Sequence, residues 1–465
     1  MMKNSRADSP FEARTLLRVS AHAAKVMNSP MTATQIPARP AAAYESAFPN
    51  GPRPDPVEVD GRPQSLIRRF AERFALIAFG LYHVPLFLNN YPSLGGGGFN
   101  DIGLAARWGH VFTIPSLWVA RYVFHIAHPG GASGDNGDVS EEYARLLLAV
   151  VIGILGALAW TIADRRRPRG TWVESTLRVL LRYSIALGLM SYGIAKIFPQ
   201  QFPPIATATL DRRVGDLTPM ALLWTFMQYS RPYAFFGGVM ELVAAALLCF
   251  RRTATLGALV CLAVMTNVAF LNYAYGVPVK LYATMILLSA AVLVIYDAPW
   301  LFDVFVRGRS AGPSRESTVL QDRIPRAWRR VIEVAAVGSV ALSSVAAMTG
   351  TLKPSAPSSP LEGTWRVISP SPSAAWRRFS IMYGGMMIRT AGDSTFGCRL
   401  NNAAAGATAT LTCAGGHGGD IRWARTRDTL RIEGAFDSLP VSVTATSVDR
   451  TSYPLMRGRF RWIVE

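Results

Sequence analysis

Apolar residues along this chain gather in blocks of about 20 instead of recurring at period 2 or 3.6. A block of this length is what an α-helix needs to cross the roughly 30 Å hydrocarbon core of a bilayer. Two weaker segments, 105–126 and 219–229, contain polar side chains and are predicted to be interfacial or re-entrant helices. The pattern predicts about seven membrane spans, near 74–88, 144–163, 175–198, 232–250, 254–273, 279–296 and 331–350.

The remainder of the chain divides by composition. Residues 1–63 are rich in Pro, Ala, Ser and Arg without a sustained period, which is typical of disorder. Residues 64–350 form the predicted helical membrane domain, and 351–360 are a Pro/Ser linker. Within 361–465 the apolar positions alternate at period two between turn signals, which predicts about eight short strands. The expected fold is a polytopic α-helical membrane protein with a small C-terminal antiparallel β-barrel or sandwich.

Charge placement predicts the topology. The chain has 48 Lys+Arg and 30 Asp+Glu, a net charge of +18, and its arginines cluster at the ends of apolar blocks. The clusters at 164–170, 250–253 and 307–330 all fall on one side of a seven-span arrangement, and the acidic loop 133–142 falls on the other. This asymmetry predicts a bacterial inner-membrane protein with a cytoplasmic N-terminus and a periplasmic β domain. Membrane lipids are the expected partners, and nucleic acid is not, because no aromatic-interleaved basic motif accompanies the charge.

Two cysteines support the same orientation. Cys398 and Cys413 both lie in the predicted β domain, where an oxidising compartment would join them. On the chain-entropy model, closing a loop of about 15 residues stabilises a fold by roughly 3 kcal/mol. The sequence therefore predicts a disulfide in the β domain.

Charged side chains inside the predicted spans are candidates for a structural or functional role, because inserting each at the centre of a membrane helix costs about 2.5–3.5 kcal/mol of free energy. Glu241 lies near the middle of the fourth span, on a face that also carries Gly237 and Gly238. Small neighbours let another helix approach, so this carboxyl is expected to point into the bundle, protonated or paired. Lys196 on the third span is the predicted partner. Arg182 competes with it, since the two cations lie about 40° apart around one helix.

Three roles remain open for the Lys196–Glu241 pair. It can fix the register of two helices, line a site that binds a ligand or moves protons, or be absent, with Lys196 reaching the headgroups and Glu241 neutral. His83, Tyr192 and Asn267 are further candidates for a polar pocket within the spans. No metal site and no catalytic residues are predicted, because no phosphate-loop, Ser-His-Asp or zinc-protease pattern is present.

Two stretches, "GLMSYGIAKIF" and "GGVMELVAAALLCFRRTATLGAL", resemble the DoxX-like family of small bacterial membrane proteins. The shared pattern is a helix ending in Gly-x-x-Lys, a helix with Gly and a mid-span Glu, and a following Arg. The resemblance covers 178–297 and implies a four-helix bundle with its core at 175–297. It also implies a quinone as cofactor and a redox protein as partner. The matching positions in this sequence are Gly193, Lys196, Gly238, Glu241 and Arg252.

The β domain resembles a second family. It opens with "GTW" at 363–365, which is similar to the Gly-x-Trp start of lipocalin-like barrels, and it ends in the Arg-rich stretch 459–465. Lipocalins often place an Arg against that Trp, and such a barrel either holds a small apolar ligand or is filled with side chains. The alternative function is therefore a membrane-anchored binding or scaffold protein, whose β domain binds a lipophilic ligand or an envelope partner.

Overall fold

The computed structural model describes residues 65–90, 103–127, 129, 138–164, 171–309, 334, 338, 361–370, 375–382, 384–401 and 407–457. The region predicted to be disordered (1–63), the predicted linker (351–360) and nearly all of the seventh predicted span lie outside these residues.

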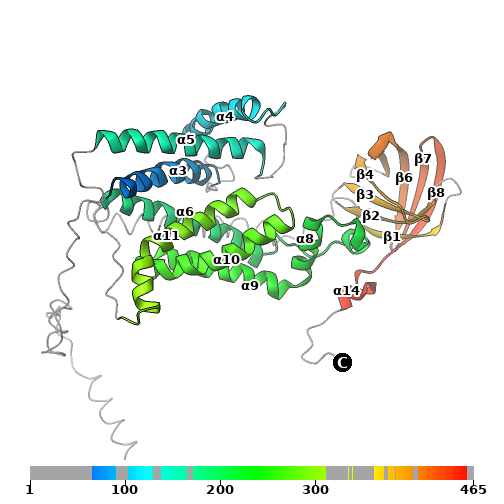
Figure 1. Cartoon of the computed structure of the whole chain (residues 1–465). Helices are drawn as coiled ribbons and strands as arrows, with labels where there is room; N and C mark the ends of the chain where they lie inside the picture. The colour runs from blue at the N-terminus through cyan, green and yellow to red at the C-terminus, as the bar shows by residue number, and fades with distance from the viewer. Residues whose placement is uncertain are drawn as a thin grey trace, which may run out of the picture. The chain divides into compact units, whose positions relative to one another are not determined.

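The first part of the described chain is helical (Figure 1). Its longer helices are α3 (Leu66–Asn90), α4 (Gly103–Tyr122), α5 (Ser140–Ala163), α6 (Thr171–Ile197), α8 (Pro219–Tyr229), α9 (Arg231–Cys249), α10 (Ala254–Ala274) and α11 (Lys280–Phe305). The shorter helical turns are α7 (Thr207–Leu210), η2 (Val214–Asp216) and η3 (Arg251–Thr253).

Five of the described helices are long and apolar enough to cross a membrane, and they correspond to predicted spans two to six. The first predicted span lies in α3, which is not among the five. Charged side chains occupy its first two turns. The described chain thus supports five of the seven predicted spans: Ser140–Ala163, Trp172–Ile197, Arg231–Cys249, Arg251–Ala274 and Lys280–Phe305.

The outward faces of these helices carry large apolar side chains. Phe270 of α10 and Ile295 of α11 are 73% and 67% exposed. Broad apolar faces of this kind are unusual on water-soluble proteins and normal where helices face lipid. Together with the helix lengths, they identify a membrane protein.

Helices α6, α9, α10 and α11 form a four-helix bundle. Consecutive helices of the bundle run antiparallel, so α6 and α10 end where α9 and α11 begin. Short connections join α9 to α10 and α10 to α11. Helices α6 and α9 are joined by the longer segment 198–230, and their direction follows from the contacts of Gly193 with Gly238 and of Arg182 with Leu248. We call this end of the bundle the Lys196 end, and the opposite one the Arg178 end. Outside the bundle, α3 packs against α5 and α6, and α4 packs on α5. The buried core includes Leu181 and Ile185 of α6, Ala244 of α9, Cys261 of α10 and Ile286 of α11.

The second part of the described chain is a closed eight-stranded antiparallel barrel in which sequence neighbours pair. Strand β1 also pairs with β8, for example Trp365 opposite Ser447, and this pairing closes the barrel. The prediction of a small β-barrel is confirmed. The strands are β1 (Gly363–Ser369), β2 (Trp376–Met382), β3 (Gly385–Thr390), β4 (Thr395–Asn401), β5 (Thr408–Cys413), β6 (Gly418–Thr426), β7 (Thr429–Phe436) and β8 (Leu439–Ser447).

Alternate residues of the strands fill the barrel interior. Met386 and Ile388 of β3 and Leu430 and Ile432 of β7 are all buried in one apolar core. The β7–β8 hairpin turns at Asp437 and Ser438, whose φ angles of 53° and 66° suit a tight two-residue turn. The pKa of the Asp437 carboxyl lies below its usual range, chiefly because the Gly418 N–H donates to it.

Cys398 and Cys413 lie directly opposite each other on β4 and β5 and form the predicted disulfide. The Arg-rich stretch 459–465, predicted to be the last strand, lies outside the described residues, and the barrel closes without it. A cation does lie over Trp365, but it is Arg425 of β6, with its guanidinium 5.2 Å from the ring centre.

Candidate functional site in the helical bundle

Lys196 and Glu241 meet inside the bundle. The Lys196 Nζ lies 2.7 Å from each Glu241 carboxylate oxygen, and the two residues are only 7% and 2% exposed. The Tyr192 ring centre lies 5.5 Å from the same Nζ, on the lysine's own helix. The predicted contact is therefore present, and both charges are removed from solvent.

Glycines make this contact possible. A Cβ on Gly193 of α6 would fall 2.8 Å from the Gly238 carbonyl oxygen, and one on Gly238 of α9 would fall 2.6 Å from that of Gly193. The two backbones therefore touch where only glycine fits. The Lys196 stem passes Gly237 and Gly238, whose added Cβ atoms would lie 4.0 Å from Lys196 Cδ and 3.0 Å from Lys196 Cβ. Because helical side chains tilt toward the N-terminus, the lysine reaches back over this gap to Glu241.

Two arginines secure the neighbouring helix ends. At the Lys196 end, the Arg231 guanidinium donates to the carbonyls of Lys196 and Ile197, which are among the last of α6. Arg182, the predicted competitor for Glu241, lies toward the Arg178 end. There its Nε and Nη2 donate to the carbonyls of Leu248 and Cys249, 3.0 and 3.1 Å away. Of the two candidate cations, Lys196 is the one that pairs with Glu241, because Arg182 contacts an end of α9 that is more than a helical turn from the carboxylate.

A cavity of about 340 Å³ lies beside the ion pair, between the four bundle helices at the Lys196 end. Small-molecule sites occupy about 300–1,000 Å³, so the volume is that of a ligand site. Helix α8 and the segment before it cover the cavity through Trp224, Met227 and Phe202. Thr218 caps α8, accepting from the Ala221 N–H at 3.2 Å, and thereby sets where this cover begins.

The cavity reaches the bundle surface between α9 and α10. Phe236 of α9 lines it and is 58% exposed, and Ala263 and Asn267 of α10 line it and are exposed as well. At the Arg178 end the same two helices touch, because a Cβ on Gly257 would lie 2.7 Å from the Leu248 backbone nitrogen. The opening therefore faces the apolar exterior of the bundle, where lipid is expected.

The lining is apolar with a few polar groups, of which Lys196 and Glu241 are the charged ones. Tyr192 and Tyr282 line it with ring centres 5.8 Å apart. Of the predicted polar pocket, Tyr192 and Asn267 belong to this cavity. His83 does not line it: this residue is buried, with its Nε2 2.9 Å from the Ser289 Oγ of α11 and its ring stacked on Phe79.

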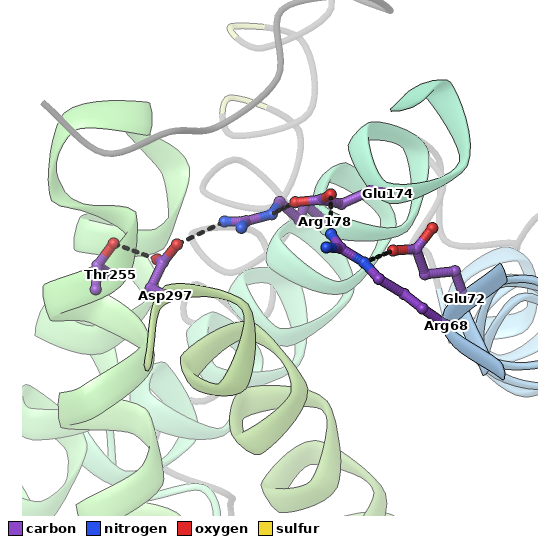
Figure 2. Close-up of polar contacts among 6 residues, drawn as sticks. All are labelled: Arg68, Glu72, Glu174, Arg178, Thr255 and Asp297. Carbon is purple, nitrogen blue, oxygen red and sulfur yellow. Dashed lines mark hydrogen bonds and ion pairs between the residues drawn. The ribbon is translucent and has the colours of Figure 1, made fainter. Parts of the chain in front are cut away.

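A second polar cluster lies at the Arg178 end (Figure 2). The Arg178 guanidinium of α6 donates to Asp297 of α11 at 2.8 Å and to Glu174 at 3.0 Å. The other Asp297 oxygen accepts from the Thr255 hydroxyl of α10 at 2.5 Å. One chain of contacts thus joins three helices of the bundle.

The same cluster continues to α3. The Arg68 guanidinium donates to Glu174 at 3.1 Å and to Glu72 at 2.8 Å, as Figure 2 shows. Nearby, Arg73 of α3 donates to the Asp164 carboxylate at 2.5 Å, just past the end of α5. Each cation named here has an acidic partner. This geometry fastens helices together and leaves no cavity of ligand size on its described residues.

Asp297, Arg178 and Asn272 are not among the site residues predicted from sequence. Asp297 carries a signal that could have identified it, because it is a carboxylate in the apolar run of α11. Glu174 and Arg178 are four residues apart on one helix, a spacing that pairs side chains. This spacing does not show which residues of other helices the two side chains contact.

The groups around the cavity are suited to binding and orienting a ligand. Within the described part of the chain, no group of three or more His, Cys, Asp and Glu side chains is placed to hold a metal ion. The Glu241 carboxylate accepts hydrogen bonds from Lys196, and tyrosine rings and apolar side chains line the rest of the cavity. A lipophilic molecule with a small polar head fits this chemistry.

Comparison with known proteins finds a similar protein for which no activity is described. No protein-family model and no solved structure matches the chain. It is similar to the "Uncharacterized protein YwoB" of Bacillus subtilis (strain 168), with 29% identity over 133 residues. That stretch is 29% of this chain and 84% of the relative. Part of this chain therefore resembles nearly the whole of a separate bacterial protein.

Proposed function

We propose that the helical bundle binds a lipophilic, ring-bearing molecule such as a quinone beside the Lys196–Glu241 pair. In this role the protein is a quinone-linked or redox-partner subunit of a bacterial inner membrane, related to the DoxX-like proteins. The observation that carries the proposal is the cavity of about 340 Å³ next to a buried ion pair and open between α9 and α10.

The lining suits such a ligand. Tyr192, Tyr282, Phe202 and Trp224 offer aromatic surface to a flat ring, and the opening toward lipid leaves room for an attached chain. When bound, a quinone would supply the electron chemistry that protein side chains lack. The residues of this chain contribute binding, orientation and exclusion of water.

The orientation follows from charge and belongs to the same proposal. The Arg178 end faces the cytoplasm, because the Arg-rich segments at 164–170, 250–253 and 307–330 all adjoin it in sequence. The Lys196 end and the disulfide-bonded barrel then face the periplasm, where disulfides persist. The cavity consequently lies in the periplasmic half of the membrane.

The barrel supports the alternative function less well. Its interior is packed by buried side chains from β1 to β8, including Trp365, Trp376 and Phe379. A lipocalin-like ligand site would need an open space in the barrel interior, which these side chains fill. In the alternative function the barrel is therefore better suited to contacting an envelope partner with its outer surface than to holding a ligand inside.

Photolabelling tests the proposal directly. The full chain in lipid nanodiscs is irradiated with a photoreactive azidoquinone that carries a decyl tail, and the labelled peptides are identified by mass spectrometry. We expect saturable labelling of the cavity-facing parts of α9 and α10, suppressed by excess unlabelled decylubiquinone. Labelling spread over all lipid-facing helices, without saturation, would overturn the proposal.

A matched pair of variants on α10 sharpens the experiment. Ala263→Trp places a large side chain at the cavity opening, whereas Leu256→Trp places the same side chain on the lipid-facing surface away from the cavity. We expect Ala263→Trp to lower specific labelling about tenfold and Leu256→Trp to leave it unchanged. Equal labelling of the two variants would show that the ligand does not enter between α9 and α10.

A further inference from the structure

Two polar atoms in the cavity are buried without a partner. Among the described residues, neither the Asn272 Nδ2 of α10 nor the Gln201 Oε1 of the segment after α6 has a hydrogen-bond partner. Asn272 is only 6% exposed. A buried donor or acceptor left unpaired is costly, and native proteins satisfy nearly all of them. These two atoms are therefore the places where a ligand would be recognised.

Both atoms belong to one end of the cavity. Phe202, which follows Gln201, and Leu271, which precedes Asn272, pack in the same apolar cluster that covers the Lys196 end. Asn272 lies two residues before the end of α10, and Gln201 lies four residues after the end of α6. The polar head of a ligand lies at this end, and its apolar body extends toward the α9–α10 opening.

The two atoms are complementary in chemistry. Asn272 Nδ2 is a hydrogen-bond donor and can bind an acceptor on the ligand, whereas Gln201 Oε1 is an acceptor and can bind a donor. A second negative charge is not favoured, because Lys196 is already neutralised by both oxygens of Glu241. An anionic lipid head would also meet the oxygen of Gln201. The preferred head is neutral and carries a hydroxyl.

We propose that Asn272 and Gln201 select a neutral amphiphile whose polar head offers both an oxygen acceptor and a hydroxyl donor. The inference rests on the proposed binding function and adds the class of head group. Between the redox forms of a quinone, the hydroquinone meets both atoms, whereas the oxidised form offers acceptors alone. Sites built to hydrogen-bond a hydroxyl reject the analogue that lacks it, because their buried polar groups are then left unpaired.

A graded set of probes separates the two contacts. Decylbenzene has neither group, 4-decylanisole has an acceptor only, 4-decylphenol has both, and 4-decylbenzoate is anionic. Binding to the full chain in nanodiscs is measured by calorimetry, with empty nanodiscs subtracted. We expect an affinity gain of about fivefold from decylbenzene to decylanisole and a similar gain to decylphenol, with decylbenzoate weakest.

Two variants assign each gain to its residue. Asn272→Leu removes the donor and should abolish the preference for decylanisole over decylbenzene. Gln201→Met removes the acceptor and should abolish the preference for decylphenol over decylanisole. Ligand-free Asn272→Leu should melt no lower than the parent protein, because it buries no unpaired donor.

The outcomes distinguish this inference from the function on which it rests. Equal saturable binding of the three neutral probes would overturn the selection of a hydroxyl head and leave the binding function intact. Absence of saturable binding by any probe would overturn both. A lower melting temperature of ligand-free Asn272→Leu would show that Asn272 already has a partner, and would remove it from the proposed site. Gln201→Met would then test the donor requirement alone.

Discussion

At the scale of single residues, the bundle contains a buried pair of opposite charges, and neither residue can be replaced alone without leaving the other charge unpaired. Lys196 and Glu241 are both buried, and each satisfies the other through two short contacts. Burying two charges costs several kcal/mol per ion, so the pair by itself is weak evidence for stability. Removal of one partner is different, because it leaves an isolated charge in the interior.

We therefore expect Glu241→Gln to destabilise the bundle by about 3–5 kcal/mol, since Lys196 would remain buried and unpaired. The double replacement Lys196→Met with Glu241→Met should be less destabilising than this single change. Melting temperatures of the detergent-purified proteins, followed by circular dichroism, measure both effects.

An exposed pair at the end of α11 provides the control, with Asp303 in the last turn of the helix and Arg307 just beyond it. Arg307 and Asp303 lie 2.9 Å apart with side chains 53% and 39% exposed, so Asp303→Asn should cost no more than about 0.5 kcal/mol. If Glu241→Gln were as mild as this control, Lys196 would have to lose its charge or find another partner. The ion pair would then not be what holds α6 to α9.

At the scale of elements, α6 and α9 approach until their backbones touch at two glycines. The carbonyls of Gly193 and Gly238 each occupy the space that the other residue's Cβ would need. This reciprocal approach lets the lysine stem lie across α9 and reach the carboxylate. The Gly-x-x-Lys and Gly-x-x-Glu spacings are therefore two halves of one contact.

We expect Gly238→Ala to separate the two helices and lower the stability of the bundle, because its Cβ would meet a backbone oxygen at 2.6 Å. Overpacking of this kind typically costs about 1–3 kcal/mol. Gly193→Ala should act in the same way, and the pair of changes should not be additive, because both disturb one contact. Thermal melts of the two single variants and the double variant test this.

Gly80→Ala in α3 is the matched control. Its Cβ would meet only Leu180 Cδ2, at an ordinary 3.9 Å. Since alanine favours a helix more than glycine does, this change should be neutral or stabilising by up to about 1 kcal/mol. Equal losses for Gly80→Ala and Gly238→Ala would contradict a special close approach at Gly238.

At the scale of the whole molecule, the two ends of the bundle differ in chemistry. The Arg178 end carries paired buried charges that join α3, α6, α10 and α11. The Lys196 end carries the cavity and its apolar cover. One end is thus tied by many contacts between helices, and the other has room for a ligand.

The proposed orientation predicts which end meets which compartment. In a background with Cys249 and Cys261 replaced by Ser, single reporter cysteines are placed at Val214, which is 74% exposed, and at exposed Arg307. A membrane-impermeant maleimide should label Val214→Cys in cells with a permeabilised outer membrane, and Arg307→Cys only after lysis. The reverse pattern would contradict a periplasmic Lys196 end.

Local pattern was sufficient for much of the fold. Apolar blocks located the helices α5, α6, α9, α10 and α11, and alternation located the strands β7 and β8. Of the seven predicted spans, five are long apolar helices of the described chain, the first lies in α3, which is not among the five, and nearly all of the seventh lies outside the described residues. At the site, Lys196, Glu241, Tyr192 and Asn267 could be chosen as costly or polar groups in apolar helices. His83 satisfied the same criterion but lies elsewhere.

The sequence by itself determined the class of protein, the disulfide pair and which charges needed a partner, since hydropathy, period and the cost of a buried charge are local properties. Only the tertiary structure decided that Arg182 serves the end of α9, that Arg178 and Asp297 join distant helices, and that a cavity remains beside Glu241. Partners and empty space depend on how helices far apart in sequence approach one another. Here that approach is set by two glycine backbones in contact, which no periodicity encodes.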